Sequence, residues 1–191
     1  MKKVILILFG IMCLAQWIVP GKMIYDSENI ISEGTVFKFK TEPIDPSDPF
    51  RGKYVTLRFE ADFIEFQDST DWQAGDEIFV TFTTDSLGFA KAENGYRSAP
   101  AAESYLHTSV EYVNNYEYDR SIVFQLPFDR FYLEESKASQ AEQLYWKAQR
   151  DSAQVAYGLV SIGPGQAVLS DVYINDRPIV DIIDELNEDV E

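Results

Sequence analysis

The stretch between residues 41 and 59 constrains the fold of this chain most. Three prolines between residues 43 and 49 hold the backbone extended and remove amide donors, so a helix cannot form there. Gly52 then permits a backbone conformation that other residues avoid. A run of β-branched and aromatic residues follows from Tyr54 to Phe59 and is typical of a strand. The sequence therefore predicts a stiff, acidic loop that leads into a central β-strand.

The charge balance limits the partners of the chain. Its 191 residues include 32 acidic and 16 basic ones, which gives a formal net charge of −16. Proteins that bind nucleic acid need a basic surface to contact phosphates, so we expect no nucleic-acid partner. A hydrophobic content of 46% with 14% aromatic residues indicates a packed globular fold. The length suits an anchor followed by one domain.

Cysteine and histidine are too scarce for several kinds of site. Cys13 is the single cysteine and lies in the apolar N-terminal stretch, so no intramolecular disulfide can form. His107 is the single histidine, which excludes a zinc site built from several Cys and His ligands. A Ser-His-Asp triad would have to use His107, and no nucleophile-elbow motif lies near it. We expect no metal and no cofactor.

The N-terminus has the pattern of a membrane segment. Lys2 and Lys3 precede an apolar run from Val4 to Val19, and continuing it to Ile24 brings it to spanning length. No convincing cleavage site follows, which favours a retained signal anchor over residues 1–24; a removed signal peptide is the alternative. The two lysines would stay in the cytoplasm, at the inner membrane, and place the C-terminal part outside. Residues 25–34 are interpreted as a connector.

The remainder, residues 35–184, is predicted to be a single extracytoplasmic β-rich domain. Alternating or β-rich segments at 35–40, 54–66, 77–83 and 122–126 predict strands. Two further apolar segments, 155–162 and 167–174, flank Gly163-Pro164-Gly165 and predict a hairpin.

One helix is predicted within the domain. Ser139 and Glu142 have the spacing of a capping box, and an apolar stripe continues to about Ala153. Residues 185–191 are expected to form an acidic tail. The predicted fold class is mainly β (α+β): an antiparallel domain, barrel-like or sandwich, with one amphipathic helix.

The residues Gly52-Lys53-Tyr54-Val55-Thr56-Leu57-Arg58-Phe59 resemble the signature of the bacterial GDYXXLXY family, whose members are membrane-anchored proteins of uncharacterised function. Lys53 stands where the family name has Asp, and Phe59 where it has the final Tyr. A second similarity lies at Arg130–Glu135 and a third in the closing hairpin. The resemblance implies an anchored domain that accompanies a multi-spanning membrane protein, and it implies no catalytic activity.

Two charged segments, 43–51 and 130–135, are interpreted as one candidate binding surface. Its proposed members are Asp45, Asp48, Arg51, Tyr54, Arg130, Tyr132 and Glu135. We expect Arg51 to pair with Glu134 or Glu135, or Arg130 to pair with Asp45 or Asp48, because a guanidinium bridges carboxylates well. The alternative is that these contacts only close one end of the domain.

The sequence is compatible with two functions. The first is a non-enzymatic accessory or binding module that works with an integral membrane protein. The second is a cell-envelope hydrolase, which would need two facing carboxylates. The acidic residues considered for it are Asp45, Asp48, Asp129, Glu134 and Glu135.

Overall fold

The computed structural model describes residues 2–42, 54–66, 71–116, 119–151 and 153–188. Its elements follow the order α1 (Lys2–Glu33), β1 (Thr35–Lys40), β2 (Tyr54–Thr56), β3 (Phe63–Glu65), β4 (Glu77–Thr84), β5 (Ala90–Tyr96), β6 (Tyr105–Tyr116), β7 (Asp119–Phe124), β8 (Arg130–Tyr132), α2 (Glu135–Arg150), β9 (Ala156–Ile162), β10 (Pro164–Gly165), β11 (Ala167–Ile174), β12 (Arg177–Pro178) and α3 (Ile179–Glu188). A long N-terminal helix thus precedes a mainly antiparallel β domain, which confirms the predicted fold class.

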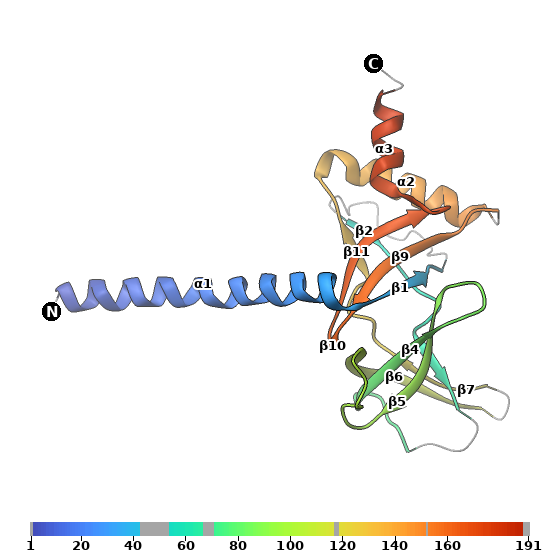
Figure 1. The fold of residues 1–191 in the computed structure, drawn as a ribbon, viewed down its shortest axis with the longest axis horizontal. Coiled ribbons are helices and arrows are strands. Elements are labelled where there is room, and N and C mark those ends of the chain that lie inside the picture. Colours follow the sequence, from blue (N-terminus) through green and yellow to red (C-terminus); the bar gives the residue numbers. More distant parts are fainter. Residues whose placement is uncertain (1, 43–53, 67–70, 117–118, 152, 189–191) are drawn as a thin grey trace.

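Helix α1 projects from the domain as one 32-residue helix (Figure 1). Its apolar side chains are exposed, as at Leu14 (69%) and Trp17 (78%). By length and composition it could cross a membrane, and it is near the N-terminus, where a signal sequence would have the same character. The range expected as a connector continues the helix to Glu33, because no glycine or proline lies between Tyr25 and Glu33.

The first sheet has the strand order β1-β9-β11-β12 and is antiparallel throughout. The predicted hairpin is confirmed as β9 and β11, which pair from Ala167 opposite Ile162 to Ile174 opposite Ala156. Helices α2 and α3 pack near this sheet and near each other. The core below them contains Phe39, Tyr145 and Ile183, each with no exposed surface. Helix α3 is a second domain helix beside the predicted one.

The second sheet has the order β3-β7-β6-β4-β5, and β10 pairs with β6 in parallel. Its end strands β3 and β5 come close: a Cβ on Gly95 would lie 3.1 Å from Cδ1 of Ile64. In the described part of the chain, however, no ladder joins β3 to β5. A barrel requires hydrogen bonding around its whole circumference. The expectation of a β-barrel is therefore wrong, and the two sheets form a sandwich-like arrangement.

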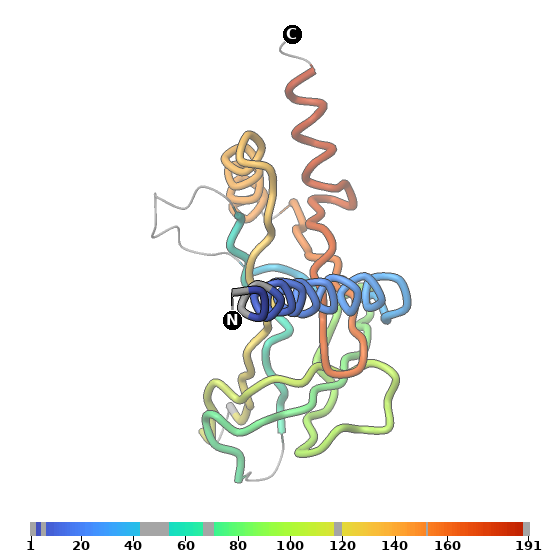
Figure 2. Tube along the Cα trace, turned by 90° about the vertical axis from the view of Figure 1, so that its left-hand side faces the viewer, coloured from blue at the N-terminus to red at the C-terminus, as the bar shows by residue number. Residues whose placement is uncertain are grey.

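Aromatic rings connect the two sheets. The ring of Phe82, on β4 of the second sheet, lies 5.2 Å from that of Phe39 on β1 of the first sheet. Within the second sheet it also lies 6.2 Å from the ring of Phe124 on β7. Edge-to-face contacts of this kind stabilise packed cores beyond the area they bury. Figure 2, which looks at the face from which α1 projects, shows α2 and α3 on one side of α1 and the second sheet on the other. The domain therefore extends across the axis of α1.

Candidate functional site at the base of α1

Helix α1 meets the domain at a tightly packed joint. The amide of Gly34 donates a hydrogen bond to the carbonyl oxygen of Ile30 over 2.9 Å. A Cβ on Gly34 would lie 2.4 Å from that oxygen and 3.0 Å from the carbonyl oxygen of Ile162. The side chain of Ile30 in turn lies beside Gly163, where a Cβ would come within 3.2 Å of it. Only glycine fits at this joint, and β1 begins immediately after it.

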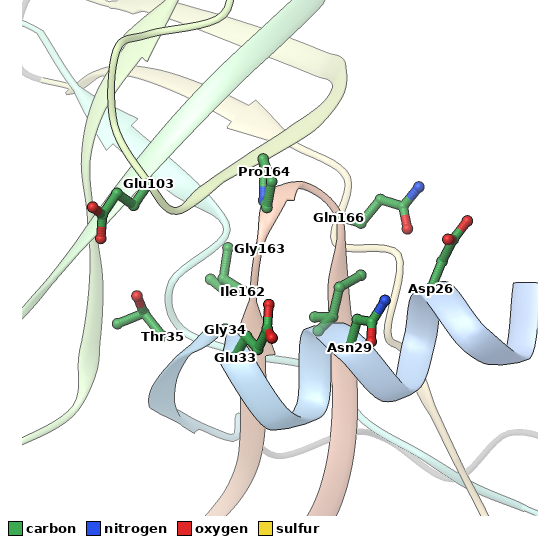
Figure 3. A pocket seen from close by; sticks show the side chains of 11 residues that line it. Asp26, Asn29, Glu33, Gly34, Thr35, Glu103, Ile162, Gly163, Pro164 and Gln166 are labelled. Atoms are coloured by element: carbon green, nitrogen blue, oxygen red, sulfur yellow. The ribbon is translucent and has the colours of Figure 1, made fainter.

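A shallow pocket of about 480 Å³ lies at this joint, and we call it the base pocket. Its walls come from the last turns of α1, from Thr35, from the hairpin turn at residues 162–166, and from Glu103 on the loop before β6. Figure 3 shows Asp26, Asn29 and Glu33 along α1, with the hairpin turn rising beside them. Pockets of this size hold small ligands or side chains of a partner.

The base pocket is acidic. It contains three carboxylates, on Asp26, Glu33 and Glu103. Asp26 is paired within α1, because the ammonium group of Lys22 lies 2.5 Å from its carboxylate. Neither Glu33 nor Glu103 has a basic side chain within ion-pair distance among the described residues. A cationic group that entered the pocket would find two carboxylates free to pair with it.

A second hollow, of about 400 Å³, borders α1 and shares Asp26 and Gln166 with the base pocket. It contains His107, whose ring stacks on Phe79 at 4.4 Å between centroids and whose Nε2 lies 3.8 Å from Glu77. His107 belongs to β6, which lies between β4 and β7 in its sheet. The single histidine is thus on a central strand beside α1, with a partly exposed side chain.

Three residues of the predicted surface do come together, on the antiparallel ladder of β2 and β8. Tyr54 is opposite Tyr132, with 5.6 Å between ring centroids. The guanidinium of Arg130 lies 5.0 Å from the centroid of Tyr54. A hydrogen bond to Tyr132 raises the pKa of Arg130, and the charge of Asp129 acts in the same direction. We call Tyr54, Arg130 and Tyr132 the ladder cluster.

The other members of the predicted surface lie outside the described residues or at the start of α2. Asp45, Asp48 and Arg51 lie outside the described residues, so their pairing with Arg130, Glu134 or Glu135 stays a prediction. Glu135 is the first residue of α2, and Glu134 is its N-cap without a side-chain capping bond. The prediction that Ser139 begins a capping box is wrong. Ser139 lies inside α2, which starts one turn earlier because the buried Ala138 extends the packed face of the helix.

Comparison with family models gave one match, to the GDYXXLXY protein model, over residues 16–172. The chain belongs to the GDYXXLXY family. The matched range begins within α1 and extends into β11, so it includes the joint and the base pocket. No curated protein and no solved structure matched this chain.

The second half of the family motif, from Val55 to Phe59, contributes side chains to the core. Val55, Leu57 and Phe59 point into the core and are 1%, 3% and 2% exposed. Phe59 packs against Phe39 at 5.9 Å and Phe128 at 5.4 Å between centroids. A phenylalanine therefore suits the position where the family name has tyrosine, since the ring is surrounded by apolar groups. The half-buried Tyr54 faces the opposite side and joins the ladder cluster.

A pocket that the sequence did not suggest lies around Asp62. It has a volume of about 430 Å³ and is lined by Arg58, Asp62, Glu111 and Asp129, among others. Burial raises the pKa of the Asp62 carboxyl; its own backbone and Arg58 oppose this effect, and Glu111 adds to it. Asp62 and Glu111 are distant in sequence and are brought together by the folding of the second sheet. No local sequence signal could have identified the pair.

Proposed function

We propose that this GDYXXLXY protein is a membrane-anchored, non-enzymatic module whose domain lies outside the cytoplasm and acts together with an integral membrane protein. The observation that carries the proposal is the joint at Gly34. Helix α1 passes into β1 without a flexible linker, and its last turn packs on the hairpin turn. The anchor therefore fixes the orientation of the domain, which a simple tether would not need to do.

The dimensions of α1 suit this role. At about 1.5 Å per residue, the apolar part from Val4 to Ile24 is about 31 Å long, close to the hydrocarbon thickness of a bilayer. The next residues, Tyr25 to Glu33, would add about 13 Å of polar stalk. Lys2 and Lys3 at the start of the helix favour a cytoplasmic N-terminus and an inner-membrane location. The acidic domain would then lie just above the membrane surface.

The shape of the molecule supports a contact with a neighbouring membrane protein. The domain extends across the axis of α1 in both views (Figures 1 and 2). With α1 perpendicular to the bilayer, the face around the base pocket would be directed toward the membrane surface. Since α1 exposes its apolar side chains on all sides, it has room to pack against the helices of a partner.

Site-specific photo-crosslinking tests the proposal. A photoreactive amino acid in place of Leu14, which is 69% exposed on α1, should crosslink one integral membrane protein in native membranes. The matched control replaces Tyr116, which is 73% exposed on β6, and should give no such product. Crosslinks to lipid alone from position 14 would contradict the proposal.

The orientation of the domain needs its own experiment. Protease added to intact spheroplasts should digest the domain and leave a fragment that contains α1. Protection of the domain until the membrane is permeabilised would place it in the cytoplasm and overturn the proposed location.

One observation favours a hydrolase as the second candidate: Asp62, with its raised carboxyl pKa, shares a pocket with Glu111. A general acid and a second carboxylate are the groups that glycoside hydrolysis requires. Hydrolysis of cell-envelope glycan by the full chain, lost in both Asp62→Asn and Glu111→Gln, would support this alternative. Activity that is absent in the wild type, or that survives in either variant, would remove it.

A further inference from the structure

We propose that the base pocket receives a lysine or arginine side chain from the membrane-exit segment of a helix in the partner protein, packed alongside α1. This inference rests on the proposed function, because it assumes that the partner is an integral membrane protein. It adds the location of the contact and the chemistry of the group that is recognised.

The base pocket would lie close to the membrane surface if α1 spans the bilayer. Its α1 residues, Asp26 to Glu33, follow directly after the apolar part of the helix. With that apolar part in the hydrocarbon, the pocket lies at the level of the lipid headgroups or just above them. Packed helices have axes about 8–10 Å apart. A partner helix beside α1 would thus leave the membrane next to this pocket.

The charge of the base pocket suits a cationic occupant. Glu33 and Glu103 approach the pocket from two different elements, and neither has a cationic partner among the described residues. Asp26 adds a third carboxylate, which Lys22 already compensates. Complementary charge favours a partner that brings a cation, and it disfavours anionic groups such as lipid phosphates. The pocket is therefore suited to a lysine or arginine side chain.

The size and the walls of the base pocket suit a segment of protein chain. The pocket, at about 480 Å³, is much larger than a bare metal ion. Within the described part of the chain, no three His, Cys, Asp or Glu residues are arranged to hold a metal. Its walls also include Ile30 and Pro164, which can contact the aliphatic stem of a long basic side chain. A segment of protein chain fits these features better than an ion.

The experiment uses the full chain in native membranes with two photoreactive positions. One replaces Asn29 in the base pocket, and the other replaces Leu14 in the apolar part of α1. Both should crosslink the same membrane protein, and the peptide crosslinked from position 29 should contain a lysine or arginine. Combining Glu33→Lys with Glu103→Lys should lower the yield from position 29 by about tenfold or more, because like charges would then oppose each other.

A matched control separates local from general charge effects. Combining Glu93→Lys with Glu188→Lys makes the same charge change at exposed positions of β5 and α3 and should leave both yields unchanged. Reversing the crosslinked basic residue of the partner to glutamate should restore the yield in the Glu33→Lys, Glu103→Lys chain. Thermal unfolding of each variant verifies that the domain is folded.

The outcomes distinguish the two proposals. Without a protein crosslink from either position, the proposed function fails. With a membrane protein crosslinked from position 14, the proposed function stands, and the inference is overturned by any of three results at position 29: lipid alone, a second copy of this chain, or a yield that the double reversal leaves unchanged.

Discussion

The amide of Gly34 donates a hydrogen bond to the carbonyl oxygen of Ile30 over 2.9 Å, and this bond closes the last turn of α1 just before β1 begins. The contact leaves no space for a side chain at position 34. A short distance between two backbone groups thus determines how α1 is joined to the domain. Replacing Gly34 by alanine adds one methyl group and therefore tests how tightly the joint is packed.

Gly34→Ala should destabilise the protein. Its Cβ would lie 2.4 Å from the carbonyl oxygen of Ile30, so the backbone has to shift. Overpacking of this kind costs about 1–3 kcal/mol. The measurement is thermal unfolding of the detergent-solubilised full chain. Gly21→Ala is the control, since nothing lies within 4 Å of the Cβ it would add. Equal melting temperatures for Gly34→Ala and the wild type would show that the joint is not tightly packed.

The raised pKa of Asp62 predicts how the stability of the protein changes with pH. Burial raises the pKa of its carboxyl in the folded state above the ordinary value. Between those two pKa values the folded state holds more protons than the unfolded state, so the contribution of Asp62 to stability falls as pH rises through that window. Above that window the partly buried charge of Asp62 is unfavourable, and Asp62→Asn should raise the melting temperature there.

The control for Asp62→Asn removes one negative charge elsewhere. Glu188→Gln, at the exposed end of α3, makes the same change in net charge and should have a smaller effect at pH 7. The melting temperatures should be compared at pH 4 and pH 7. A gain for Asp62→Asn that is as large at pH 4 as at pH 7 would contradict the assignment to the ionised carboxyl.

The parts of this fold that could be predicted from the sequence depend on neighbours along the chain. The hairpin of β9 and β11 was predicted because Gly163, Pro164 and Gly165 mark its turn between two apolar segments. The extent of α1 was underestimated because polar residues after Ile24 suggested a connector, although none of them ends a helix. The start of α2 was missed because packing of Ala138 determines it, and no capping motif does.

The candidate site depends on contacts that the sequence does not reveal. The base pocket joins Asp26 on α1 to Glu103 and to Gln166, three positions far apart along the chain. The ladder cluster was predicted in part, because Tyr54 and Arg130 both lie in segments that resemble the family. Its pairing of Tyr54 with Tyr132 follows from strand register, which no local pattern specifies.

Tyr145 should contribute strongly to stability. It has no exposed surface, and burial raises the pKa of its hydroxyl to about 12, although Thr41 and Gln149 lower it in part. Tyr145→Ala should cost about 3–5 kcal/mol, because it removes a large buried ring and leaves a cavity. Tyr116→Ala deletes the same group at a position that is 73% exposed and should cost about 0.5 kcal/mol or less. Urea unfolding of both variants measures the difference, and similar costs would place Tyr145 outside the core.

The ladder cluster offers a test of the predicted binding surface that does not depend on the base pocket. Arg130→Glu should leave the domain folded, because the Arg130 side chain is 48% exposed and its contacts with Tyr54 and Asp129 lie on the surface. If this surface contacts the membrane partner, the variant should lower the crosslinking yield from position 14. Lys91→Glu, an exposed reversal on β5, is the matched control and should leave that yield unchanged. A yield that stays the same in folded Arg130→Glu would show that the cluster only joins β2 to β8, whereas an unfolded Arg130→Glu domain would make the arginine structural.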